Sequence, residues 1–219
     1  AQHTTTSNTK DGIQKALEHF GIITDQPLFV SRDDHFNKVK AFHQLMDGQT
    51  QEEPKAWDNQ EALYRTMFKQ EELVEFIRAA SKDEASFDRS MERLHQALDE
   101  AANKVRSKHP AEISMVGQVD ALIDTLYLTY GSFVLMGVDP EEVFDIVHRA
   151  NMGKIFPDGQ AHFDEVTHKI LKPDDWEEKY APEPAIQKEI ERQIKAYQKH
   201  CSEKTVEAEE NKREWDRNR

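Results

Sequence analysis

The stretch between Ser114 and Val138 constrains the fold most, because it is apolar except for two charged residues, Asp120 and Asp124. A helix that is apolar on every side is normally buried. Its charge-free remainder is shorter than the ~18 residues that a membrane span needs, so we expect a helix buried inside protein and no membrane partner. A carboxylate taken out of water must be paired, protonated or bound to a metal. The sequence therefore predicts a buried helix whose aspartates meet a compensating charge.

A second group of acids lies on the helix expected at 59–80. Glu72 and Glu75 are three residues apart and share a face, and Glu71 pairs with Glu75 at i,i+4. They interrupt or border the apolar stripe of that helix. Two helices that each direct acids one turn apart at a core can form one oxygen-rich cage, which suits Mg²⁺. The alternative, a solvated face paired with Lys69 and Arg78, explains the glutamates but not the aspartates on the apolar helix.

Helical spacing of apolar residues covers most of the chain, which has only 8 Gly and 8 Pro. No strand is predicted, and 153–184 carries little pattern. We expect an N-terminal segment at 1–33, partly flexible, a helical domain at 34–180 and a charged C-terminal helix at 181–219, solvated or frayed after 203. This predicts an all-α, bundle-like fold. The helices expected are 35–46, 59–80, 84–106, 114–136, 141–151 and one from about 184.

The charge balance excludes one class of partner. The chain has 29 Lys and Arg against 42 Asp and Glu, a formal charge of −13, so we expect no nucleic-acid surface, which needs clustered positive charge. A nucleotide remains possible as a ligand, because a divalent metal can meet its phosphates. The single cysteine, Cys201, allows no intramolecular disulfide. With no signal peptide expected at the polar N-terminus, we expect a cytoplasmic protein.

Several short motifs, taken in order, resemble the all-α nucleotide pyrophosphohydrolases. This superfamily includes MazG-like proteins, dimeric dUTPases and phosphoribosyl-ATP pyrophosphohydrolases, and the similarity is greatest to the last branch. It extends over roughly 65–176 and implies a MazG-like helical bundle, with an extra helix at 84–106 between the acidic motifs and another at the C-terminus. The motifs are Glu71-Glu72-Leu73-Val74-Glu75, Asp120-Ala121-Leu122-Ile123-Asp124-Thr125-Leu126-Tyr127, Gly137-Val138-Asp139, Asn151-Met152-Gly153-Lys154 and Lys172-Pro173.

The resemblance implies a role for each motif. It makes metal ligands of Glu72, Glu75, Asp120 and Asp124, with Glu71 close by. The chain departs from the family at Ala121, where a glutamate is usual, so that Asp120 has to substitute for it.

Substrate phosphates are expected to meet basic and amide side chains. The resemblance assigns this role to Asn151 and Lys154, and Lys172 belongs to the same cationic group. Arg65 and Lys69 lie one to two turns before the glutamates and reach the same site, although they equally suit ion pairs within their helix.

The activity implied is hydrolysis of a nucleoside triphosphate, ribo or deoxy, to a nucleoside monophosphate and pyrophosphate. The expected cofactor is Mg²⁺, for which Mn²⁺ can substitute. A glutamate that is not fully used as a ligand can take the proton of the attacking water. Glu71 and Glu75 both qualify for this catalytic role, and the sequence does not choose between them.

Two other functions compete with hydrolysis. The apolar seam of 84–106 and an isoleucine stripe near the C-terminus suit a non-catalytic helical oligomerisation or interaction protein. Two Glu-x-x-His segments, Glu92 to His95 and Glu165 to His168, match the ligand spacing of di-iron bundles, a motif that also arises often by chance. The same surplus of apolar stripes, with the resemblance, predicts a homodimer or a dimer of dimers.

Overall fold

The structure of the chain is a computed structural model that describes residues 31–48, 50–51, 53–108 and 110–217. The expected N-terminal segment at 1–33 therefore lies almost entirely outside the described residues. Helices dominate this part of the chain, and it contains no strand, only an isolated antiparallel bridge between Phe163 and Ile170. The prediction of an all-α fold is confirmed.

The observed helices follow the predicted order closely. The short helix α7 was not predicted, and α8 lies within the C-terminal helix expected at 181–219. The described helices are α2 (Asp34–Met46), α3 (Asn59–Ala79), α4 (Glu84–Lys108), α5 (Met115–Met136), α6 (Glu141–Met152), α7 (Trp176–Tyr180) and α8 (Glu183–Arg217).

The chain divides into two compact units, which are described separately here. One unit combines residues 1–52 with 133–219, and the other is continuous, from 53 to 132. The first therefore holds α2, α6, α7 and α8, and the second holds α3, α4 and most of α5. The domain boundaries expected from the sequence stay a prediction.

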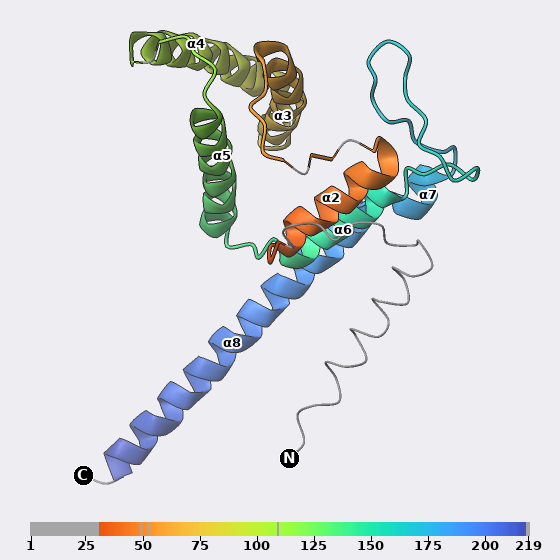
Figure 1. Ribbon diagram of the computed structural model, residues 1–219. Coiled ribbons are helices and arrows are strands. Elements are labelled where there is room, and N and C mark those ends of the chain that lie inside the picture. Colours follow the sequence, from red (N-terminus) through yellow and green to blue (C-terminus); the bar gives the residue numbers. More distant parts are fainter. Residues whose placement is uncertain (1–30, 49, 52, 109, 218–219) are drawn as a thin grey trace, which may run out of the picture. The chain divides into compact units, whose positions relative to one another are not determined.

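Helix α6 is the centre of the first unit, where it packs against both α2 and α8 (Figure 1). The buried apolar side chains of the described residues all belong to this unit and are Met46, Ile146, Ala150 and Trp176. Lys38 of α2 forms an ion pair of 2.5 Å with Asp145 of α6. Beside it, the rings of His35 and Phe144 stack with 4.0 Å between their centroids.

The turn before α6 is bound to α8 by a glutamine. Gly137 has a φ of +70°, a conformation that glycine adopts without steric cost and that ends α5. Two residues later, the Asp139 N–H donates to Gln193 Oε1 at 2.9 Å, and Gln193 Nε2 donates to the Asp139 carbonyl at 2.9 Å. The amide of Gln193 thus meets both backbone groups of Asp139.

A buried carboxylate orients that glutamine. Glu189 is 7% exposed and accepts hydrogen bonds from Arg192 Nε at 2.7 Å, from Arg192 Nη2 at 2.6 Å and from Gln193 Nε2 at 2.9 Å. The bond from Arg192, followed by the one from Gln193, lowers the pKa of Glu189 to about 2. Glu189 is therefore charged over the whole physiological pH range.

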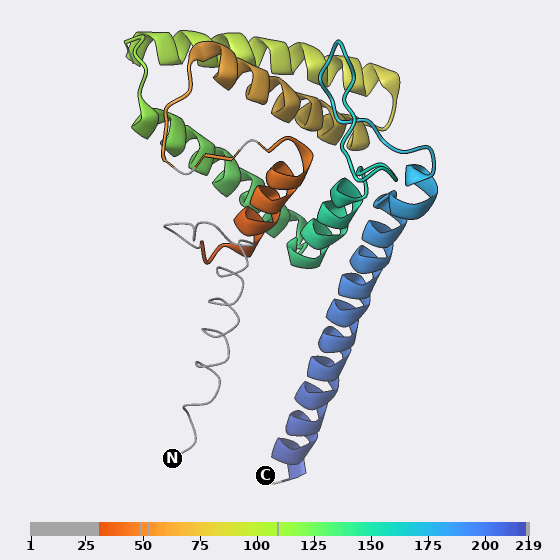
Figure 2. The ribbon, with the colours of Figure 1, turned by 45° about the vertical axis from the view of Figure 1, so that its right-hand side comes forward.

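Helix α8 continues far beyond its contact with α6, as one uninterrupted helix to Arg217 (Figure 2). Of the two states expected after 203, solvated or frayed, the structure shows the first, a helix whose described side chains are exposed. Acid–base pairs one turn apart support the distal part, with Lys199 Nζ at 3.8 Å from Glu203 and Arg213 Nη2 at 3.6 Å from Glu209. Such pairs stabilise a helix without tertiary contacts.

In the second unit, α3 and α4 pack against each other, as both ribbon views show (Figures 1 and 2). A capping box starts α3: the Asp58 side chain accepts from the N–H groups of Gln60 and Glu61, and Glu61 accepts from the N–H of Asp58. At the junction of the helices, Arg78 binds Glu84 at 2.8 Å and lies 5.0 Å from the Phe87 ring centroid.

Helix α5 is exposed along most of its length. None of its residues, all of which the structure describes, is buried. Exposure reaches 90% at Leu135, 78% at Val116 and 77% at Tyr127. The expectation of a buried helix is therefore wrong for the single chain. An apolar pattern predicts burial, but it does not specify what covers the helix. By length and composition alone, α5 is also apolar enough to cross a membrane.

Candidate functional site

Three of the predicted acids lie in the second half of α3. Glu71, Glu72 and Glu75 are all exposed. Within the part of the chain that the structure describes, Glu72 and Glu75 have no hydrogen-bond or ion-pair partner, whereas Glu71 interacts with another residue. The solvated-face alternative paired these glutamates with Lys69 and Arg78, but Arg78 instead binds Glu84. The carboxylates of Glu72 and Glu75 are thus available to a ligand.

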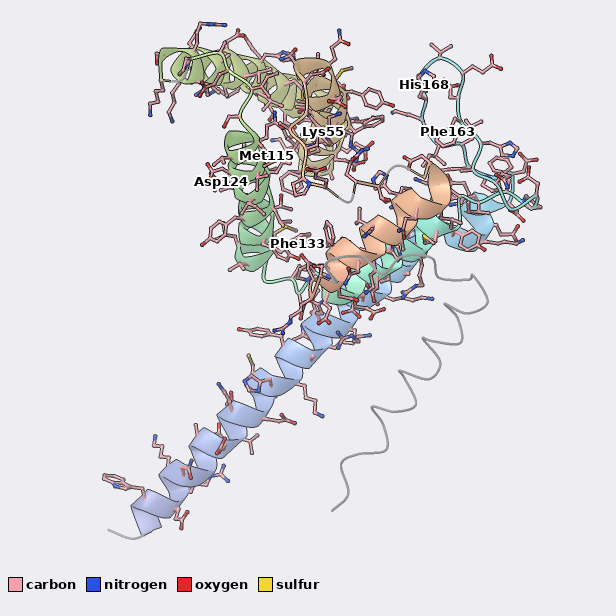
Figure 3. All side chains as sticks on the ribbon, in the orientation of Figure 1. Lys55, Met115, Asp124, Phe133, Phe163 and His168 are labelled. Atoms are coloured by element: carbon pink, nitrogen blue, oxygen red, sulfur yellow. The ribbon has the colours of Figure 1, made fainter. Side chains whose placement is uncertain are left out.

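The other two predicted ligands lie in the first half of α5. Asp120 and Asp124 are one helical turn apart and exposed, and Figure 3 labels Asp124 on α5 beyond Met115. No hydrogen bond or ion pair involves either aspartate within the described residues. Both therefore keep a full set of acceptor oxygens on an otherwise apolar helix.

The single chain does not gather these acids into one cage. Among the described residues, no group of three or more His, Cys, Asp or Glu is arranged so that it could hold a metal. The donor chemistry does suit Mg²⁺, because all four side chains offer charged oxygens. The ligand set of Glu72, Glu75, Asp120 and Asp124 therefore stays a prediction, with two ligands on each of two helices of one unit.

Arg65 and Lys69 precede the glutamates on α3. Lys69 Nζ donates to the Arg65 carbonyl at 3.0 Å. Desolvation, and then the positive charge of Arg65, lower the pKa of Lys69. The guanidinium of Arg65 lies 5.9 Å from the ring centroid of Phe68. Two cations held this close favour an anion beside them, and their predicted role as phosphate contacts is untested.

Asn151 and Lys154 lie together at the C-terminal end of α6, in the first unit. Lys154 Nζ donates to Asn151 Oδ1 at 2.8 Å, and the two backbones meet through the Lys154 N–H and the Asn151 carbonyl at 3.1 Å. Both side chains are half-buried. The structure thus brings these two predicted phosphate contacts into one amide–ammonium pair.

Lys172, the remaining predicted phosphate contact, is engaged with α7. Its Nζ lies 3.8 Å from the ring centroid of Trp176 and 3.0 Å from Glu177 Oε1. Lys172 belongs to the same unit as Asn151 and Lys154. Its contact with substrate stays a prediction.

Three residues that sequence reasoning did not single out bind segments that carry predicted site residues. Trp176 and Tyr180 of α7 contact the end of α6, and Gln118 of α5 binds the backbone of Trp57. A helix of five residues is too short for apolar residues to repeat at helical spacing, so no pattern in the sequence indicated α7. The one available signal was the tryptophan itself, since a large aromatic in a polar segment has to be covered by something.

The two Glu-x-x-His segments do not form a di-iron site in the described part of the chain. Glu92 and His95 are exposed on α4. Glu165 and His168 lie in the loop between α6 and α7, and His168, labelled in Figure 3, has a φ of 55°, which is not helical. The helical spacing that would align a glutamate with a histidine is absent from the second segment.

Comparison with known proteins identifies the family. The family model "Phosphoribosyl-ATP pyrophosphohydrolase" matches residues 39–151, just over half of the chain. This segment includes all the predicted acids, Arg65, Lys69 and Asn151. No curated protein sequence matches the chain.

A solved structure supports the same conclusion. It is the crystal structure of a "putative NTP pyrophosphohydrolase" from Exiguobacterium sp. 255-15, with 36% identity and a TM-score of 0.68. The match covers 76% of this chain and 99% of that chain. Both comparisons support a hydrolase of the nucleotide pyrophosphohydrolase type. The resemblance noted in the sequence is thereby confirmed, and the chain belongs to the phosphoribosyl-ATP pyrophosphohydrolase family, within the all-α, MazG-like superfamily.

Proposed function

We propose that the chain hydrolyses a nucleoside triphosphate to a nucleoside monophosphate and pyrophosphate with the help of Mg²⁺. One observation carries the proposal: α3 bears Glu72 and Glu75 and α5 bears Asp120 and Asp124, each pair one turn apart, and none of the four has a partner among the described residues. All four lie within the residues that match the family. Partnerless carboxylates on an apolar helix need a function to account for them, because they make the helix harder to bury.

The roles of the acids follow from their chemistry. Glu72, Glu75, Asp120 and Asp124 would hold the metal, which when bound neutralises phosphate charge and lowers the pKa of water. Glu71 and Glu75 are the candidates for the base that takes the proton of the attacking water. Mn²⁺ would replace Mg²⁺, because it accepts the same oxygen ligands.

Asn151 and Lys154 would bind the phosphate chain. A Lys ammonium offers three N–H donors and a positive charge, and an Asn amide adds two donors. Charged hydrogen bonds to phosphate oxygens are about twice as strong as neutral ones. The name of the family model specifies phosphoribosyl-ATP, and that of the solved structure specifies NTP. Both names describe substrates with a polyphosphate chain, which this pair is suited to bind.

The assembly we propose is a homodimer or a dimer of dimers, with α5 at the contact between copies. Unit 53–132 has no buried residue among those described, so it has no closed core of its own. Exposed apolar patches of this extent mark interaction sites. Two-fold symmetry would place the same helix on both sides of the contact. The acids of α5 would then enter a protein interior, where a metal compensates their charge.

A membrane is the other environment that could cover α5. We propose a cytoplasmic protein because Asp120 and Asp124 would each cost about 2.5–3.5 kcal/mol at the centre of a membrane helix. Sedimentation of the expressed chain with the membrane fraction, in the absence of detergent, would contradict this location.

The decisive experiment is a substrate screen with release of pyrophosphate as the readout. The eight common nucleoside triphosphates and phosphoribosyl-ATP are each incubated with the purified chain and with Mg²⁺, Mn²⁺ or EDTA. We expect metal-dependent release from at least one nucleoside triphosphate. Release from phosphoribosyl-ATP alone would show that the substrate is phosphoribosyl-ATP and would contradict the proposed nucleoside triphosphate.

The same samples distinguish the enzyme from a non-catalytic interaction protein. A ligand that binds only the folded state raises its stability, so the enzyme's melting temperature should rise as Mg²⁺ is titrated. A chain that neither releases pyrophosphate nor responds to metal in its melting temperature is an interaction protein.

A further inference from the structure

We infer that α7 is a positioning element for phosphate binding, in which Trp176 and Tyr180 hold Asn151 and Lys154 in place. The inference rests on the proposed function, in which Asn151 and Lys154 bind phosphate. Both α7 residues lie beyond the residues that match the family model, which end at 151. The family model therefore assigns no role to either residue.

Trp176 binds the last turn of α6 directly. Its side chain is 5% exposed, and its indole N–H donates to the Ala150 carbonyl at 2.9 Å in a buried hydrogen bond. The last four carbonyls of a helix have no partner within the helix. An indole has a single N–H and accepts nothing, so this bond holds the N–H edge of the ring at the end of α6.

Backbone groups bind the carbonyls on either side. The Gly153 N–H donates to the Arg149 carbonyl at 3.0 Å, and the Lys154 N–H donates to the Asn151 carbonyl at 3.1 Å. Three consecutive carbonyls at the end of α6 are thus hydrogen-bonded. The backbone on which Asn151 and Lys154 stand is consequently fixed on both sides of the turn.

Tyr180 packs against Gly153, which lies between Asn151 and Lys154 in the chain. A Cβ placed on Gly153 would overlap the Tyr180 ring, so glycine is required there for close approach. The ring covers the turn that joins Asn151 to Lys154. A rotation of this turn would have to displace α7. Asn151 and Lys154 therefore cannot change their orientation without breaking the contacts of Trp176 and Tyr180.

Lys172 adds a third contact, with the face of the Trp176 ring. Its ammonium lies 3.8 Å from the ring centroid and is held by Glu177 Oε1 at 3.0 Å. A cation over an indole face is an attractive arrangement. Trp176 is therefore held by its edge at Ala150 and by its face at Lys172.

Trp176→Phe tests the inference, because it keeps a ring and removes the N–H. The loss of one hydrogen bond that orients the phosphate contacts should raise KM about fivefold, with kcat changed less than twofold. Tyr180→Ala should act in the same direction, and since Tyr180 is 42% exposed this variant should still fold. Trp215→Phe, the same change at a site 57% exposed on α8, is the matched control and should leave KM unchanged.

A double-mutant cycle shows whether Trp176 acts through the lysine. If it does, Trp176→Phe should lose most of its effect on kcat/KM when Lys154 is already alanine. Equal effects in both backgrounds, or a rise in KM no larger than that of Trp215→Phe, would overturn the inference.

Binding without turnover separates this inference from the proposed function. Calorimetry with inorganic pyrophosphate and Mg²⁺ should show weaker binding in Trp176→Phe than in the wild type, whether or not any nucleotide is hydrolysed. Equal affinities would contradict the positioning role. A wild type that binds pyrophosphate but hydrolyses nothing would contradict only the proposed function.

Discussion

Gln118 of α5 and Trp57, in the segment that leads into α3, exchange two hydrogen bonds. The Trp57 N–H donates to Gln118 Oε1 at 2.9 Å, and Gln118 Nε2 donates to the Trp57 carbonyl at 2.8 Å. Gln118 lies two residues before Asp120, and Trp57 immediately precedes the capping box of α3. The two helices that carry the acids are thus linked at their first turns by one side chain.

This link predicts the effect of Gln118→Met, which preserves the length of the side chain and removes both bonds. Net hydrogen bonds contribute about 1 kcal/mol each, so the free energy of unfolding should fall by about 2 kcal/mol. Gln118→Glu keeps the acceptor and should lose about half as much. Urea denaturation measures both changes, and equal stability of all three proteins would show that the link contributes nothing.

Asp124→Asn should abolish hydrolysis and leave the protein folded. Loss of an outer-shell partner of a metal already costs 10–100-fold, so the loss of a ligand should reduce kcat/KM to below about 1% of the wild type. The side chain is exposed, and circular dichroism should be unchanged. Glu72→Gln should behave alike, and the double variant should be little worse than either single one, because both serve one site. Asp88→Asn, exposed on α4, is the control. Full activity of Asp124→Asn would refute the metal site.

Lys154→Ala should weaken nucleotide use and leave metal binding intact. A hydrogen bond to a charged group contributes about 1.5–3 kcal/mol, which corresponds to a fall of at least about tenfold in kcat/KM. Calorimetry with Mg²⁺ alone and with nucleotide separates the two effects. Loss of metal affinity with unchanged nucleotide affinity would show that the role is assigned wrongly.

The stability of the unit that contains α6 and α8 should depend on pH through Glu189. Its pKa is lowered from 4.5 to about 2, first by the hydrogen bond from Arg192. A lowered carboxyl pKa stabilises the folded state fully above the unfolded value near 4.5, and this stabilisation disappears as the pH falls towards 2. Thermal melts of the wild type and Glu189→Gln should therefore differ above pH 4.5 and converge below it. A difference that is the same at all pH values would exclude this carboxylate as its source.

Light scattering should give a mass of two or four times 25.4 kDa at micromolar concentration. Within the described residues none of α5 is buried, so most of its apolar surface is exposed to a second copy. Truncation after Ser202 should keep both assembly and activity, because the helix beyond it is supported by local ion pairs. A mass near 25 kDa together with full activity would refute the assembly.

The sequence predicted most helices well where an apolar stripe repeats over several turns. The prediction of 59–80 for α3 differs from the observed Asn59–Ala79 by one residue, and Asp58 marks its start by its capping chemistry. α7 could not be predicted, because five residues do not span two turns. For the far end of α8 the sequence left two states open, solvated or frayed, because charged residues favour solvent whether they are helical or not.

The candidate site was predictable in its residue types and not in its contacts. The pairing of Asn151 with Lys154 follows from their spacing of three at a helix end. The bond from Trp176 to Ala150 joins residues 26 positions apart. It depends on the path of the loop between α6 and α7, in which the sequence shows no regular pattern. The burial expected for α5 is not provided by the described part of the single chain.

The two ends of α6 are bound by residues from outside the segment that defines the family. Gln193 holds Asp139 at one end, and Trp176 holds Ala150 at the other, whereas the family model ends at 151. A chain cut back to residues 39–151 would leave these polar groups without their partners. Residues 39–151 thus contain the whole of α6 except its last residue, but not the side chains that hold its two ends, so its stability depends on a part of the chain that the family model leaves out.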